Sequence, residues 1–260
     1  EDFYLCPLCT AIGNLGALAF VYWHLRSRVG VGFTRVSLRE VWVEIRDSPQ
    51  FLLSRMAASI NSNLNGLLLK HAMPDASLSI YTNPDMATGL YTSADTVIQA
   101  ARNGMSPIAD SLYPHMMKHR NFSIVKKALL FIYPVILLGC AFVFAFAEPL
   151  LTLWLGPEGR DVVLPLRLMI PVAVFCFPNY VLGYPTLGAM GLAKYANIST
   201  GFGTVIYLIG AWVCYKTVGI SLPALCILSS VTEFSILLFR LAVIIKNRRL
   251  LQSPDEEGKK

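Results

Sequence analysis

Apolar residues in this chain come in blocks of about 20, and no other feature constrains the fold as strongly. A block of that length crosses about 30 Å of hydrocarbon as an α-helix that rises about 1.5 Å per residue. Apolar residues make up 55% of the chain and charged residues 15%, with a mean hydropathy of +0.54. Soluble domains carry roughly 25% charged residues. The sequence therefore predicts an all-α integral membrane protein, a polytopic helix bundle.

Seven transmembrane helices are predicted from these blocks. They lie near residues 3–25, 49–69, 87–112, 125–147, 162–187, 196–216 and 219–245. The chain opens at Glu1 and passes almost directly into the first span, so we expect a further N-terminal part to precede it. The last residues, QSPDEEGKK at 252–260, are polar and are expected to be disordered.

The basic residues are shared unevenly between the two sides of these spans. Fifteen of the 22 Lys and Arg residues fall on one side and three on the other. Basic loops stay in the cytoplasm under the positive-inside rule. We therefore expect a basic cytoplasmic linker at 26–48 and a cytoplasmic tail at 246–260, with 71–86 and 148–161 outside. The net charge of +6 follows from this topology, and no nucleic-acid partner is expected.

The second span carries polar side chains along one helical face. At about 100° per residue, Ser59 and Ser62 fall on the face of Arg55, and Asn63 flanks it. The opposite face is apolar. Such a stripe either hydrogen-bonds neighbouring helices or lines a polar cavity. The added arginine favours the cavity, because a charge near the helix centre costs about 2.5–3.5 kcal/mol on insertion scales.

The third span repeats this pattern. Tyr91, Asp95, Gln99 and Arg102 share one face, and apolar residues cover the other. Arg102 lies about 15 Å from the cytoplasmic end of its span and Arg55 about 9 Å from its own, so the two lie at similar depth. A guanidinium fork matches phosphate oxygens. We interpret these two stripes as a substrate site for a phosphate-bearing ligand.

Two acidic residues in the spans have open roles. Asp95 lies seven residues from Arg102, about 10 Å along the helix axis, so no direct pair between them is expected. Asp95 and Glu233 either balance arginine charge or carry a coupling proton or sodium ion. Charge balance is the favoured role for Asp95, because one acid among several basic residues usually serves as a counter-ion.

Two other arginines and three prolines lie in the later spans. Arg167 and Arg240 lie close to span ends, and we expect both side chains to reach the membrane surface. Pro171, Pro178 and Pro185 recur every seven residues in the fifth span and predict a bent helix. The cysteines and histidines are scattered, so no metal site and no redox site is predicted.

Three motifs resemble one family of transporters. They are PQFLLSRMAASINSN with Ser54-Arg55, GLYTSAD with Tyr91 to Asp95, and SPIADSLYPHMMK with Pro107-Ile108 and Leu112 to Pro114. Their order and spacing are similar to helices seven and eight of the Wzx-type polysaccharide (O-antigen) flippases. These belong to the multidrug/oligosaccharidyl-lipid/polysaccharide (MOP) exporter superfamily, which includes the MATE-like exporters.

The resemblance implies an architecture. Such transporters have two six-helix lobes around a central cationic cavity. Residues 1–25 would then be helix six, at the end of the first lobe, and 49–245 would be the second lobe.

The resemblance also implies a function. It is the flipping of an undecaprenyl-pyrophosphate-linked oligosaccharide across the bacterial cell inner membrane for surface polysaccharide and lipopolysaccharide biosynthesis. Alternating access would need no covalent chemistry and no cofactor, with a proton or sodium gradient as an open addition. The partners implied are the lipid-linked oligosaccharide, membrane lipids and other polysaccharide assembly proteins.

Other classes remain as alternatives. A drug or cation exporter of the same superfamily would need an acidic cavity. A membrane-embedded polysaccharide polymerase or ligase would need a large outer loop, and the longest one expected here has about 18 residues. A scaffold that transports nothing is the third alternative.

Overall fold

The computed structural model describes residues 5–29, 37, 64–71, 83–119, 122–217 and 219–251. The chain divides into two compact units, Glu1–Ser48 and Pro49–Lys260. In the first unit, helix α1 runs over Leu5–Val29 and carries Arg26 and Arg28 in its last turn. Its 25 residues are long enough to cross a bilayer.

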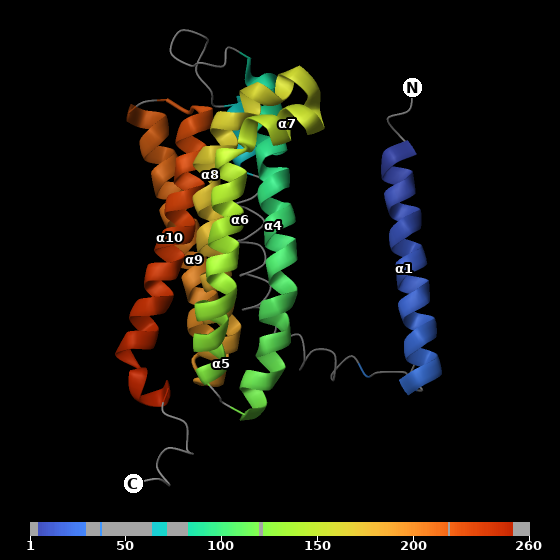
Figure 1. The fold of residues 1–260 in the computed structure, drawn as a ribbon, viewed down its shortest axis with the longest axis vertical. Coiled ribbons are helices and arrows are strands. Elements are labelled where there is room, and N and C mark those ends of the chain that lie inside the picture. The colour runs from blue at the N-terminus through green and yellow to red at the C-terminus, as the bar shows by residue number, and fades with distance from the viewer. Residues whose placement is uncertain are drawn as a thin grey trace. The chain divides into compact units, whose positions relative to one another are not determined.

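The second unit is a bundle of long helices that run side by side (Figure 1). Residues 64–71 are helical. The named elements that follow are α4 (Pro84–His119), α5 (Phe122–Lys127), η2 (Ala128–Ile132), α6 (Tyr133–Ala145), α7 (Ala147–Leu155), η3 (Gly156–Glu158), α8 (Gly159–Val181), η4 (Leu182–Gly188), α9 (Ala193–Thr217), α10 (Leu222–Lys246) and η5 (Arg248–Leu251). Helix α8 packs against α4, α6, α7 and α10 and therefore occupies the centre of this unit.

The all-α membrane fold predicted from the sequence is confirmed. Four helical stretches in the described part of the chain are long and apolar enough to cross a membrane: Phe122–Ala145, Ala147–Gly188, Ala193–Thr217 and Leu222–Lys246. Helix α4 is longer than its predicted span, with 36 residues, and it is more polar than these four. Its polar residues gather on one face, as the candidate site below describes.

The bend predicted in the fifth span lies at its C-terminal end. The prolines at 171 and 178 lie inside the continuous helix α8. The backbone leaves helical geometry at Gly183, two residues before Pro185. A proline ring clashes with the carbonyl four residues earlier and offers it no N–H. That carbonyl, at Val181, accepts a hydrogen bond from Oγ1 of Thr186 at 2.8 Å instead. The bend is therefore built into the local sequence.

The expected outer loop at 148–161 proves to be largely helical. Helix α7 ends at Leu155 and is followed by Gly156, whose φ of 72° is accessible to glycine without strain. The chain then turns directly into α8, where Gly159 lies so close to the α7 backbone that a Cβ would meet the Leu151 carbonyl oxygen at 2.3 Å. Two glycines and an apolar stretch thus make a helical corner where a loop was expected.

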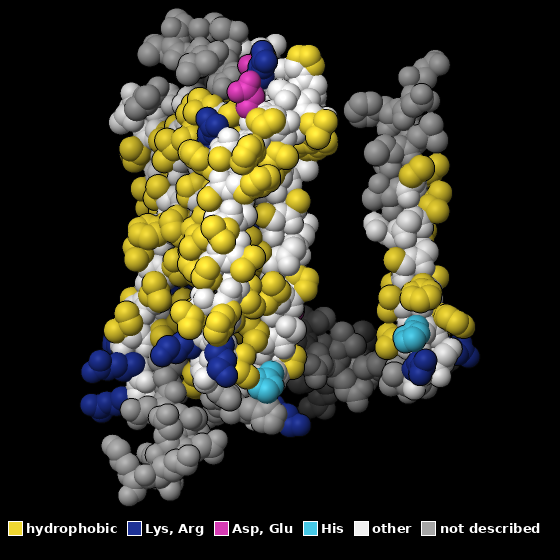
Figure 2. Space-filling view, in the orientation of Figure 1, with side chains coloured by type: hydrophobic (Ala, Val, Ile, Leu, Met, Phe, Trp, Pro, Cys, Tyr) yellow, Lys and Arg dark blue, Asp and Glu magenta, His cyan; other side chains and the backbone are white. Residues whose placement is uncertain are grey.

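Basic side chains gather at one end of the second unit (Figure 2). This end holds the C-terminal ends of α4 and α10, the helix α5, the N-terminus of α9 and the element η5. The described basic residues there are Lys118, Lys126, Lys127, Lys194, Lys246, Arg248 and Arg249. On the face that Figure 2 shows, the lateral surface between the two ends is mostly apolar, as expected for a surface that faces hydrocarbon.

Candidate functional site

A polar cavity of about 110 Å³ lies inside the second unit. Four named helices and the segment 64–71 contribute to its wall. The lining residues are Asn65, Tyr91, Asp95, Gln99, Arg102, Met169, Val172, Thr200, Tyr207, Ser229, Thr232, Glu233 and Ile236. Polar groups placed in the interior of a membrane bundle need hydrogen-bond partners or water, because lipid provides neither.

Arg102 on α4 and Glu233 on α10 form an ion pair across this cavity. Nη2 of Arg102 lies 2.7 Å from Oε1 of Glu233. Both side chains are about four-fifths buried, with exposed fractions of 23% and 19%. Nε of Arg102 is also buried and has no hydrogen-bond partner in the described part of the chain. The guanidinium thus keeps donor capacity beyond its ion pair.

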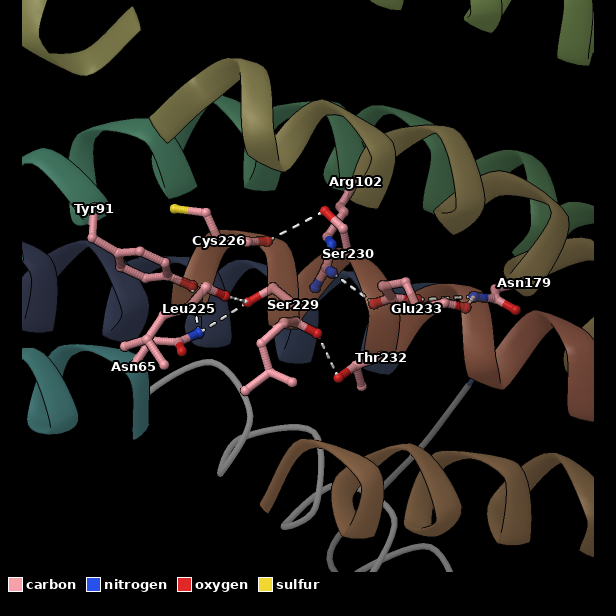
Figure 3. A network of polar contacts seen from close by, with 11 residues as sticks. Asn65, Tyr91, Arg102, Asn179, Leu225, Cys226, Ser229, Ser230, Thr232 and Glu233 are labelled. Atoms are coloured by element: carbon pink, nitrogen blue, oxygen red, sulfur yellow. Dashed lines mark hydrogen bonds and ion pairs between the residues drawn. The ribbon is translucent and has the colours of Figure 1, made fainter. Parts of the chain in front are cut away.

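The second oxygen of Glu233 continues the network toward α8 (Figure 3). Nδ2 of Asn179 donates to Oε2 of Glu233 at 2.9 Å and to its backbone carbonyl at 3.0 Å. The backbone carbonyl of Asn179 in turn accepts from Nη1 of Arg240. Three helices are therefore joined by charged and amide groups in the middle of an otherwise apolar bundle.

Asn65 is the centre of a second polar cluster at the other end of the cavity. Its Nδ2 donates to the hydroxyl of Tyr91 at 2.6 Å and to Oγ of Ser229 at 3.2 Å. Its Oδ1 accepts from the hydroxyl of Tyr207. The residue is 1% exposed. One asparagine thus ties α4, α9 and α10 to the segment 64–71.

The structure brings together five of the nine site residues predicted from the sequence. Tyr91, Asp95, Gln99, Arg102 and Glu233 all line the cavity. The other four, Arg55, Ser59, Ser62 and Asn63, lie outside the described residues. The predicted convergence of two arginines therefore stays a prediction, whereas the shared polar face of α4 is confirmed.

Asp95 and Glu233 differ in their partners. Asp95 and Arg102 form no ion pair, as expected from their spacing, and Glu233 is the carboxylate that pairs with Arg102. Asp95 interacts with the side chain of Gln99, one turn away on the same helix. Within the described part of the chain, Asp95 forms no ion pair at all. Glu233 therefore takes the counter-ion role that the sequence favoured for Asp95.

The prediction that Arg240 reaches the membrane surface is wrong. Its side chain turns into the bundle and is 8% exposed. Nε donates to Oγ of Ser199 at 2.8 Å, and Nη2 lies 3.5 Å from the Ala196 carbonyl. The carbonyls at the end of α8 and the start of α9 offer acceptors that replace water. A bent helix end thus makes a buried site for a guanidinium.

Four residues of the two networks were not predicted. Asn179, Tyr207, Ser229 and Arg240 each lie within apolar spans. The available signal was an amide, a hydroxyl or a guanidinium at a position where lipid would surround it.

Comparison of the chain with protein-family models, with curated protein sequences and with solved structures finds no match. The resemblance to flippases therefore stays a prediction. The cavity wall presents a guanidinium, two carboxylates, amides and hydroxyls around a small polar space. Such groups recognise a charged, hydroxyl-rich ligand or an ion.

Proposed function

We propose that this chain belongs to a transporter that flips lipid-linked oligosaccharides by alternating access. The observation that carries the proposal is Arg102, a guanidinium on the wall of a polar cavity inside a membrane bundle. A charge in that position is costly, so membrane proteins retain it mainly where it serves a pathway or a site. No covalent step is required of such a protein.

The proposed ligand is an oligosaccharide carried on undecaprenyl pyrophosphate. Arg102, together with Arg55, would bind the phosphate oxygens, because the planar guanidinium presents paired donors. Gln99, Tyr91, Ser59, Ser62 and Asn63 would hydrogen-bond the sugars. The cavity of about 110 Å³ is smaller than ligand sites of roughly 300–1,000 Å³, so the walls must separate to admit the head group.

The topology belongs to the same proposal. Seven spans follow from the apolar blocks of the sequence, and a cytoplasmic C-terminus follows from the positive-inside rule. A location in the bacterial inner membrane is what the resemblance to flippases implies. The basic end of the second unit supports this orientation. The lipid tail would stay in the bilayer, and other polysaccharide assembly proteins would supply and receive the substrate. A proton or sodium gradient acting at Asp95 or Glu233 would drive the cycle in one direction.

Substitution of Arg102 tests this function. Arg102→Ala should reduce surface polysaccharide by about tenfold or more in cells that depend on this protein, because the pyrophosphate loses its donor. Arg102→Lys should restore part of the activity, since the charge survives without the fork. Asn103→Ala, a change at the next and exposed residue of α4, is the matched control and should have no effect. Normal display in Arg102→Ala cells with normal protein levels would refute the proposal.

A drug or cation exporter is a second candidate, and one observation favours it. The described cavity wall holds two carboxylates, Asp95 and Glu233, against one guanidinium, Arg102. An acidic excess suits a cationic ligand. Efflux of cationic dyes from cells separates the two functions: an exporter loses efflux in Asp95→Asn cells, whereas a flippase shows no dye efflux in either form.

A further inference from the structure

Glu233, Asn179 and Arg240 form a chain of contacts that holds the bend of α8, and we name these three residues the Asn179 clamp. Asn179 lies two residues before the end of α8 and four residues before the bend at Gly183. Two residues of helix α10, Glu233 and Arg240, contact Asn179. The side chain of Asn179 donates to Glu233, and its backbone carbonyl accepts from Arg240.

On the side of the bend, the guanidinium of Arg240 fills the space beside Gly183. A Cβ on Gly183 would lie 2.9 Å from Nη1 of Arg240, so the guanidinium occupies the position that a side chain would need. The same guanidinium bonds Ser199 and reaches the Ala196 carbonyl in the first turns of α9. Arg240 therefore contacts both the end of α8 and the start of α9.

The cavity side of the clamp depends on both oxygens of Glu233. Oε1 accepts from Arg102 at 2.7 Å, and Oε2 accepts from Asn179 at 2.9 Å. The amide of Asn179 uses its donor group here, while its own Oδ1 is buried without a partner in the described part of the chain. The amide is thus oriented for Glu233 alone. Any group that takes one oxygen of Glu233 forces Arg102 and Asn179 to compete for the other.

We propose that Asn179 is a positioning residue that couples events at Glu233 in the cavity to the bend of α8. When a bound cation, a proton or a ligand occupies one carboxylate oxygen, the amide of Asn179 loses its side-chain acceptor and keeps only the backbone carbonyl of Glu233. The end of α8 is then held less firmly on the cavity side. The turn that joins α8 to α9 then opens more often. This inference goes beyond the proposed function, because it requires no particular substrate.

Amide hydrogen exchange of the full chain in lipid nanodiscs tests the coupling. Glu233→Gln keeps the shape of the side chain but leaves one acceptor oxygen in place of two. It should raise the exchange rate over residues 182–188 by about threefold, as should Asn179→Ala, because local opening becomes easier. The double variant should exchange no faster than the faster single variant, since both changes break the same link.

A matched control removes a different link between the same helices. Oγ of Ser230 on α10 donates to the Leu168 carbonyl of α8 at 2.9 Å, away from the clamp. Ser230→Ala should leave exchange over 182–188 unchanged. If Asn179→Ala does not yield folded protein, Asn179→Ser takes its place. The short side chain of serine cannot reach both Oε2 and the backbone carbonyl of Glu233. Unchanged exchange in Glu233→Gln, additive effects in the double variant, or an equal rise in Ser230→Ala would each overturn the proposal. Loss of transport in any variant bears only on the proposed function.

Discussion

Helices α4 and α6 lie in the same bundle and pack against the same helix α8. They differ in the kind of side chain that they expose and the kind that they turn into the bundle. In the most apolar stretch of Phe122–Ala145, which comprises α5, η2 and α6, only 6% of the residues are buried inside the bundle. The side chain of Leu138, for example, is 71% exposed. Helix α4 instead turns an arginine, an acid and an amide toward the cavity. In water the apolar helix would be the buried one. In lipid an exposed leucine costs little, so polar residues mark the interior.

Removal of Arg240 should have the largest effect on stability. Arg240→Ala removes the charged donor from Oγ of Ser199 and from the carbonyls of Asn179 and Ala196, and it creates a void beside Gly183. We expect the free energy of unfolding to fall by about 3 kcal/mol, since hydrogen bonds to charged groups contribute about 1.5–3 kcal/mol. Unfolding in mixed detergent micelles measures this. Arg167→Ala, at a half-buried arginine of α8, is the control and should cost less than half as much; equal costs would contradict the account.

Loss of the Asn65 cluster should have a smaller effect. Asn65→Ala removes partners from Tyr91, Ser229 and Tyr207, and the expected cost is about 2 kcal/mol. Tyr91→Phe should cost about 1 kcal/mol, and the two changes together should cost less than their sum because they share one bond. Strict additivity in this cycle, measured by the same unfolding assay, would show that Asn65 and Tyr91 do not interact.

Leucine truncation on the lipid face should have the smallest effect. Leu138→Ala on α6 replaces a contact with lipid by another contact with lipid, so we expect less than about 0.5 kcal/mol. Leu225→Ala on α10 removes a fully buried side chain and should cost about 2 kcal/mol or more. If the two leucines cost the same, α6 is covered by another part of the protein.

Hydropathy was sufficient to predict an all-α membrane bundle, and helical periodicity was sufficient to predict the polar face of α4. Tyr91, Asp95, Gln99 and Arg102 share that face because their spacing follows the helix period, which is a local property. The partner of Arg102 lies 131 residues away on α10, and no local pattern carries such a pairing. The same reason explains the error on Arg240. Its position near a span end favoured the membrane surface, whereas the acceptors at the bend of α8 exist only in the folded bundle.

Helix α7 was missed for a different reason. Its residues were assigned to a loop because a short segment between two predicted spans usually connects them. The corner depends on Gly159 packing against the Leu151 carbonyl, a contact between two helices that meet only in three dimensions. Both residues can be read from the sequence, but the close approach of Gly159 to the Leu151 backbone is visible only in the folded structure.

We expect the polar face of α4 to line a water-accessible cavity and α6 to face lipid. A background without the six native cysteines should carry either Gln99→Cys on α4 or Leu138→Cys on α6. A water-soluble, membrane-impermeant thiol reagent needs a thiolate, which forms only where water reaches the sulfur. Gln99→Cys protein in membranes should react about tenfold faster than Leu138→Cys protein. Equal rates, or faster reaction at position 138, would contradict the account.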